Sequence, residues 1–193
     1  FLSGVSVLSR DPKAAAVVAF GDSITDGANT TVVNHRWPDL LAERFRTEGN
    51  RGHLGVLNQG ISGNRLLHDP SPVPGTSAEG YAVWFGRSAL TRFDKDVLSQ
   101  PGARYLIVLL GVNDIGQPGT DVAPPAEAVT AQQVINAHRQ LIARAHARGM
   151  KAVGGTILLL TVALWLLASF PAPPPGATGP AIEYSLAGML GRM

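Results

Sequence analysis

Three short segments combine glycine with polar residues, and each follows an apolar run. They are GDSITDG (21–27), ISGNR (61–65) and GVND (111–114). A serine hydroxyl attacks a carbonyl only when a base removes its proton, and the oxyanion that forms needs hydrogen-bond donors around it. Ser23 offers a hydroxyl and a backbone N–H, Gly63 an N–H with no side chain in the way, and Asn113 a side-chain amide. Together these groups could surround one oxygen atom.

The elements that must position these residues can be predicted from apolar runs and helical periodicity. Strands are expected at 14–20, 56–58, 104–110 and 151–157, helices at 37–48, 82–98 and 130–148, and Pro- and Gly-rich loops at 69–80 and 116–126. Thr130 and Gln133 match a capping box, and Gly149 is expected to end that helix. Alternating strands and helices predict a parallel sheet covered on both faces, whose sites form at the carboxyl ends of the strands.

In order and spacing, the three segments resemble the first three motif blocks of the GDSL esterases, also called SGNH hydrolases. The resemblance covers roughly residues 14–157. It implies a three-layer α/β/α sandwich with a central parallel sheet (flavodoxin-like), whose C-terminal part is here atypical or incomplete. It also implies hydrolysis of acyl or acetyl esters of carbohydrates or lipids, with no metal or cofactor. Ser23 would be the nucleophile, and its N–H, the Gly63 N–H and the Asn113 side chain would form the oxyanion hole. Asp22 would hold the turn by bonding to backbone groups.

Each segment also has a structural interpretation. Asp22 and Ser23 are both suited to cap a helix N-terminus. Gly63-Asn64 and Asn113-Asp114 are pairs typical of turns, as are Asp26 and Gly27. The functional interpretation depends on all three segments occurring together.

The base that should activate Ser23 is missing from the expected place. The fourth block of the family is Asp-x-x-His, but none of the five histidines has an aspartate three residues before it; they are His35, His53, His68, His138 and His146. His68 follows the second segment and is a candidate substitute, whereas His138 lies on an apolar helix stripe. Loss of a triad member leaves only about 10³–10⁴-fold catalysis over water. We therefore expect a poor esterase.

The sequence changes character near residue 155. We divide the chain into an N-terminal extension (1–13), a hydrolase-like domain (14–157) and an apolar, Pro-rich tail (158–193). The abrupt loss of charge favours a frameshift or assembly error that replaced the end of an esterase. A membrane anchor at 153–170 is an alternative, but it is short for a span, begins with Gly-Gly and lacks a following basic cluster. The third alternative is an unusual but complete fold.

Composition narrows the functional classes further. The chain has 193 residues, a net charge of +2 and no cysteine. So small and scattered a positive charge argues against a nucleic-acid partner, and the absence of cysteine excludes disulfides and thiolate catalysis. Because the chain begins at Phe1 without Met and a leader could have been removed, we expect a secreted or periplasmic protein. Two other functions remain: a non-catalytic carbohydrate- or acyl-binding protein, and a phosphate or nucleotide binder, which Asp22 and Asp26 disfavour.

Overall fold

The apolar runs form a sheet of four parallel strands. These are β1 (Ala15–Gly21), β2 (Leu54–Gly60), β3 (Ala103–Leu109) and β4 (Lys151–Gly154), arranged in the order β2-β1-β3-β4. The computed structural model describes residues 5–48 and 51–155, all within a compact unit that spans residues 1–157. Val17 to Phe20 of β1 are buried on both faces, which explains why this strand reads as a continuous apolar run.

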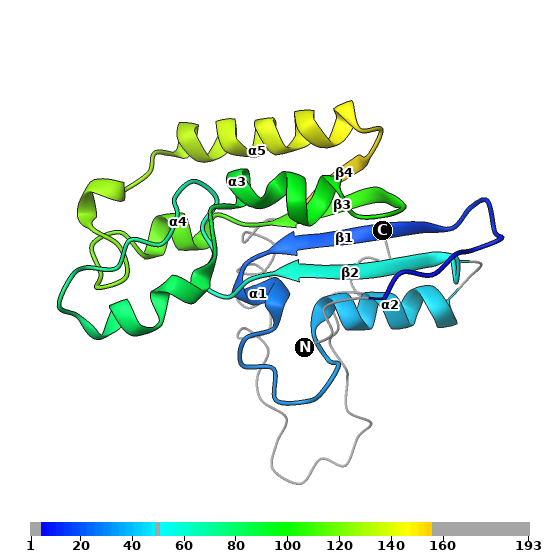
Figure 1. Ribbon diagram of the computed structural model, residues 1–193, viewed down its shortest axis with the longest axis horizontal. Coiled ribbons are helices and arrows are strands. Elements are labelled where there is room, and N and C mark those ends of the chain that lie inside the picture. Colours follow the sequence, from blue (N-terminus) through cyan, green and yellow to red (C-terminus); the bar gives the residue numbers. More distant parts are fainter. Residues whose placement is uncertain (1–4, 49–50, 156–193) are drawn as a thin grey trace, which may run out of the picture. The chain divides into compact units, whose positions relative to one another are not determined.

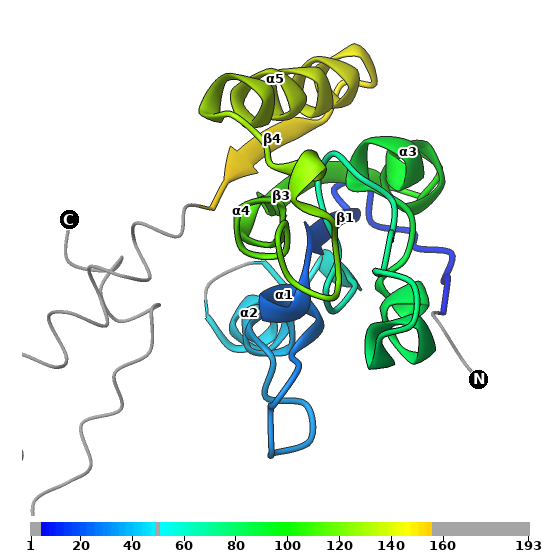
Figure 2. The same cartoon turned by 90° about the vertical axis from the view of Figure 1, so that its left-hand side faces the viewer.

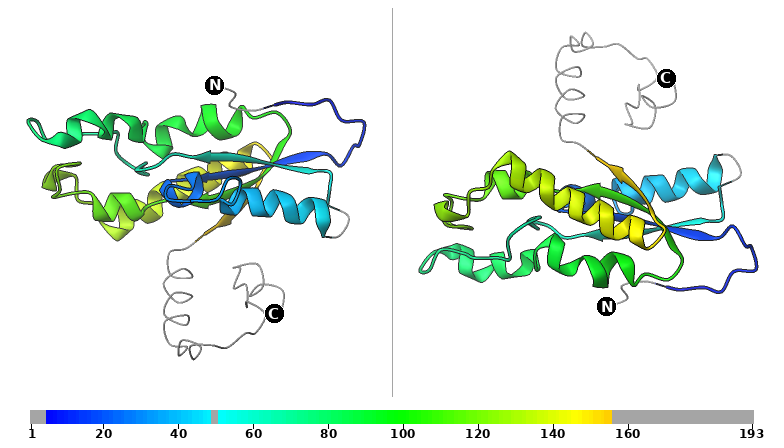
Figure 3. Two further views of the ribbon diagram at one scale, coloured as in Figure 1. Left: turned by 90° about the horizontal axis from the view of Figure 1, so that it is seen from below. Right: turned by 90° about the horizontal axis from the view of Figure 1, so that it is seen from above.

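Helices cover both faces of the sheet, which confirms the predicted three-layer organisation (Figures 1 and 3). On one face, α3 (Ala89–Phe93), the π-helical turn η3 (Asp94–Leu98) and α5 (Ala131–Ala147) pack on the sheet. On the other face, α2 (Trp37–Thr47) packs against β2. The core of the first face contains Val18 and Phe20 of β1, Leu106 and Val108 of β3, Phe93 of α3, Val97 of η3 and Leu141 of α5.

The strongest helix signal in the sequence is confirmed almost to the residue. The Thr130 side chain accepts from the Gln133 N–H and the Gln133 side chain accepts from the Thr130 N–H, so the capping box is formed. Gly149 follows the helix with a φ of 71°, the left-handed conformation that suits a helix stop. The boundaries of the predicted strands at 14–20 and 104–110 each differ from the structure by one residue, and β2 extends the predicted 56–58 at both ends.

The predicted helix over 82–98 is wrong as a continuous element. The chain forms 3₁₀ turns η1 (Ser77–Gly80) and η2 (Ala82–Phe85), breaks at Gly86, and resumes helically at α3. Gly86 has a φ of 69°, which no residue within a right-handed helix adopts. The side-chain amide of Asn64 donates to the carbonyl oxygens of Phe85 and Arg87, each at 2.8 Å. A contact from a distant part of the chain therefore replaces the helical hydrogen bonds here.

The remaining predictions concern residues after 155 and lie outside the described residues. These are the tail 158–193 and most of the candidate anchor 153–170, of which Val153 and Gly154 belong to β4. Within the described ranges, no helix is both long and apolar enough to cross a membrane.

Candidate active site

The three polar segments all lie at the carboxyl edge of the sheet. GDSITDG follows β1, ISGNR follows β2 and GVND follows β3. With the strand order β2-β1-β3-β4, the connection after β1 runs toward β2 and the connection after β3 runs the opposite way toward β4, which creates a topological switch point between β1 and β3. Figure 2 looks toward this edge and shows the short helices α1 (Ser23–Asp26) and α4 (Val112–Gly116) side by side with the ends of the strands.

The first segment forms a tight strand-to-helix turn. Asp22 is the N-cap of α1, and its Oδ1 accepts from the Ile24 N–H at 3.0 Å. Ser23 is the first residue of α1 and is half-buried. Its N–H donates to no residue that the structure describes, and its hydroxyl makes no hydrogen bond to one either. Asp22 therefore caps the helix while Ser23 is the candidate nucleophile, so the structural and the functional interpretation of this segment do not exclude each other.

Asp22 is buried and only partly satisfied. Its side chain is 1% exposed, and Oδ2 has no hydrogen-bond partner among the described residues. Burial raises the pKa of Asp22 above its ordinary value, and the carboxylate of Asp114 adds to this, while the Ile24 N–H and Arg92 oppose it. The bond to Ile24 agrees with the expected structural role of Asp22.

The second segment is tied to the first by Asp26. The Asp26 carboxylate accepts from the Ser62 N–H at 3.2 Å and from the Ser62 hydroxyl at 2.5 Å. Gly63 follows with a φ of 75°, and its N–H donates to no described residue. The Phe85 ring lies where a side chain at position 63 would begin, 2.3 Å from an ideal Cβ. Glycine is therefore required twice here, by conformation and by space.

The third segment is locked to the second by two side chains. The Asn113 amide nitrogen donates to the Asn64 carbonyl oxygen at 2.9 Å. Asp114 is fully buried, and its carboxylate accepts from the Leu66 N–H at 2.6 Å and the Leu67 N–H at 2.9 Å. An amide nitrogen carries two hydrogens, so Asn113 keeps one N–H beyond its bond to Asn64. These links and the Asp26–Ser62 bonds join the segments that contain Ser23, Gly63 and Asn113.

A buried arginine that sequence reasoning missed joins the strand ends. Arg92 is 6% exposed and donates to the Gly21 and Gln59 carbonyl oxygens, each at 2.9 Å, and to Asn64 Oδ1 at 3.0 Å. It also pairs with Asp96 at 3.0 Å. Its guanidinium thereby satisfies carbonyl groups at the ends of β1 and β2. A single arginine in a helix carries no motif, so nothing in the sequence could have singled it out. The sequence likewise gives no sign of the Asp26–Ser62 link, because these two residues are 36 positions apart in the chain.

None of the three segments contains a histidine. His138 on α5 is half-buried, and burial lowers its pKa, although the backbone of Leu110 and the charge of Asp114 oppose that shift. His68, the candidate substitute base, lies near Glu127. Burial raises the pKa of Glu127, but hydrogen bonds from Ser71 and Arg65 outweigh it, so the pKa lies below its ordinary value. Neither histidine makes a hydrogen bond to Ser23.

No three metal-ligating side chains come together within residues 5–48 and 51–155. A hollow of about 350 Å³ lies beside Ile61, and it is lined by Ile61, Arg87, Thr91, Arg92, Lys95 and Asp96. Ser23, Gly63 and Asn113 are not among its lining residues, so it is separate from the candidate active site.

Comparison with known proteins identifies the family. Residues 19–185 match the GDSL-like Lipase/Acylhydrolase family, a range that includes part of the segment assigned above to a tail. Similar solved structures include a catalytic mutant of Axe2, an acetylxylan esterase from Geobacillus stearothermophilus (16% identity, TM-score 0.51, 72% of this chain and 58% of that one). Another is a GDSL-like lipase from Bacteroides thetaiotaomicron (19% identity, TM-score 0.42, 72% of this chain and 47% of that one). A third is the acetyl xylan esterase AlAXEase (21% identity, TM-score 0.47, 72% of this chain and 56% of that one).

The chain spans less than two thirds of the length of each of these structures, and no curated protein matches it. At such identities the likeness to Axe2 concerns the fold. The family match covers most of the chain and includes all three polar segments. The chain belongs to the GDSL-like lipase/acylhydrolase family.

Proposed function

We propose that this protein hydrolyses acyl or acetyl esters, with Ser23 as the nucleophile. The Ser23 oxygen bonds to the ester carbonyl carbon, the bond to the alcohol oxygen breaks, and the alcohol leaves with the proton of the serine. Water then cleaves the acyl-serine and releases the acid. Carbohydrate acetyl esters and short-chain acyl esters are both candidate substrates, and solved acetylxylan esterases share the fold.

The proposal rests on one observation: several hydrogen-bond donors at the carboxyl edge of the sheet have N–H groups without a partner among the described residues. The backbone N–H groups of Ser23 and Gly63 have no partner among the described residues, and Asn113 retains one amide N–H. An N–H group at the start of a helix or in a loop that has no partner in the protein bonds to water or to a ligand. Unpaired donors beside a serine therefore fit an oxyanion hole, in which an oxygen of the substrate completes the hydrogen bonds.

We expect hydrolysis by this chain to be slow, because the sequence lacks the Asp-x-x-His block. At neutral pH the Ser23 hydroxyl stays protonated without a base. A base supplied from solution should then compensate. Imidazole should raise the rate of p-nitrophenyl acetate hydrolysis by the unmodified protein severalfold more than it raises the rate with Ser23→Ala, which reports the reaction of imidazole itself.

The direct test of the nucleophile is covalent labelling with a reactive fluorophosphonate, read by peptide mass spectrometry. We expect one adduct, at Ser23, that Ser23→Ala abolishes and that the exposed control Ser77→Ala retains. A folded protein that forms no adduct at Ser23, together with equal imidazole responses of the two proteins, would contradict the proposal. Fast hydrolysis without imidazole that depends on Ser23 would instead show that a base is present.

A second candidate function follows from the same missing block: a non-catalytic protein that binds carbohydrate or acyl groups at the same three donors. Such a protein would not label at Ser23, but Asn113→Ala should weaken its binding of the ligand. The labelling experiment therefore separates the two functions.

A further inference from the structure

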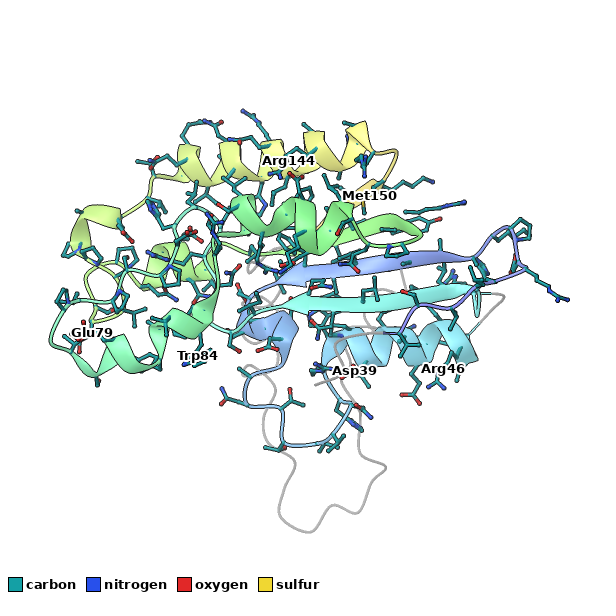
Figure 4. The ribbon with its side chains drawn as sticks, in the orientation of Figure 1. Asp39, Arg46, Glu79, Trp84, Arg144 and Met150 are labelled. Atoms are coloured by element: carbon teal, nitrogen blue, oxygen red, sulfur yellow. The ribbon has the colours of Figure 1, made fainter. Side chains whose placement is uncertain are left out.

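An exposed aromatic surface lies next to the candidate active site. Trp84 is 79% exposed, Val83 58% and Tyr81 46%, and we call these three residues the Trp84 surface. Their segment is anchored by other residues, since Ala78 and Ala82 are fully buried. Figure 4 shows the Trp84 side chain projecting outward from this segment. A tryptophan is seldom so exposed when its role is packing.

The Trp84 surface is joined to the loop of Gly63 through the neighbouring residue Phe85. The Phe85 ring occupies the space beside Gly63, and the Asn64 amide donates to the Phe85 carbonyl oxygen at 2.8 Å. The rings of Tyr81 and Phe85 pack against each other with centroids 5.9 Å apart. A ligand on Trp84 would therefore lie at a defined position relative to the candidate oxyanion hole.

We propose that Trp84, with Tyr81 beside it, is a stacking platform for a sugar ring of the carbohydrate that carries the ester. This inference rests on the proposed function and specifies its substrate class. One face of a pyranose ring presents C–H groups, which pack on the face of an indole, while the hydroxyl groups stay in water. Indole and phenol rings suit this role because each combines a large apolar face with a polar group at the edge.

The composition of the surrounding segment favours a sugar over a lipid. Apolar side chains that bind membranes are usually accompanied by lysine or arginine, which attract anionic headgroups. Residues 70–86 contain neither, and the only charged side chain among them is Glu79, which is exposed. The next residue, Arg87, is paired with Asp69 at 3.4 Å. The apolar area is also limited to three side chains on one short segment. A flat polar chain such as a polysaccharide fits this surface better than a bilayer does.

The test measures binding rather than catalysis, so it is independent of the missing base. In native gel electrophoresis of the full chain, soluble xylan in the gel should retard the protein. Trp84→Ala should weaken the apparent affinity about tenfold, and Tyr81→Ala less. Trp84→Phe should retain most of the binding, because it keeps an aromatic face. Ile142→Ala, an exposed apolar residue on α5, is the matched control and should bind like the unmodified protein.

Retardation by xylan is measured independently of fluorophosphonate labelling at Ser23, so a failure of the esterase proposal would be recognised separately. The inference is overturned if the unmodified protein is not retarded, or if Trp84→Ala is retarded equally. It is also overturned if Trp84 is instead needed for sedimentation with phosphatidylcholine vesicles or for formation of a dimer in gel filtration.

Discussion

The side-chain amide of Asn113 donates a hydrogen bond to the backbone carbonyl oxygen of Asn64 across 2.9 Å. The bond joins the segment after β3 to the segment after β2, and it fixes the orientation of the Asn113 side chain. Asn64, one position from Gly63, thus holds Asn113, the third candidate donor, in place. The geometry of the oxyanion hole depends on the loop of ISGNR as much as on Asn113 itself.

Replacing Asn113 should therefore affect both chemistry and stability. Asn113→Ala removes an oxyanion donor, and we expect the rate of fluorophosphonate labelling at Ser23 to fall by about 10²–10³-fold. It also leaves the carbonyl oxygen of buried Asn64 without this donor, which should lower the free energy of unfolding by about 1–3 kcal/mol. Asn136→Ala on the exposed face of α5 is the control and should change neither quantity appreciably. An unchanged labelling rate in folded Asn113→Ala would remove Asn113 from the proposed site.

Gly63 and Gly75 form a matched pair for testing the contact with Phe85. Both have positive φ values, 75° and 80°, but an added Cβ would meet Phe85 at position 63 and open space at position 75. Both alanine variants should incur the conformational cost, whereas overpacking should destabilise Gly63→Ala by about a further 1–3 kcal/mol. Urea unfolding measures the difference. Adding Phe85→Ala to Gly63→Ala should recover part of this difference in unfolding free energy. Equal losses of stability in Gly63→Ala and Gly75→Ala would show that Phe85 does not confine position 63.

Stability below neutral pH should depend on His138. Because burial lowers its pKa in the folded state, the unfolded chain binds the proton more readily. The resulting stabilisation is fully present above the unfolded pKa of about 6.5 and is lost as the pH falls through the lower folded pKa. Between pH 7 and 5 the unfolding free energy should fall more steeply for the unmodified protein than for His138→Gln, by less than about 1.4 kcal/mol per pH unit. Asn136→Ala, an exposed change on the same helix that removes no titratable group, should keep the original slope. Parallel slopes for the unmodified protein and His138→Gln would contradict this account.

The sequence predicted those features that depend on local pattern. β1 and β3 are continuous apolar runs because both of their faces are covered, and α5 carries its own start and stop signals at Thr130 and Gly149. The positions of Ser23, Gly63 and Asn113 at one edge follow from chain order alone, since parallel strands place their carboxyl ends together.

Features that depend on distant contacts were not predictable. The break at Gly86 is stabilised by Asn64, which is more than twenty residues earlier, and Arg92 reaches the carbonyl groups of two strands. Helix periodicity contains no information about either contact. Similarly, Asp26 was interpreted as a turn residue, and its bond to Ser62 became apparent only in the fold.

We propose that the Ser23 N–H, the Gly63 N–H and the Asn113 amide surround one oxygen atom of the substrate. This arrangement can be tested by a crystal structure of the protein with a phosphonate bound covalently to Ser23. We expect a phosphonyl oxygen within about 2.7–3.1 Å of all three nitrogens. A phosphonyl oxygen that points to solvent, or that contacts neither Gly63 nor Asn113, would contradict it.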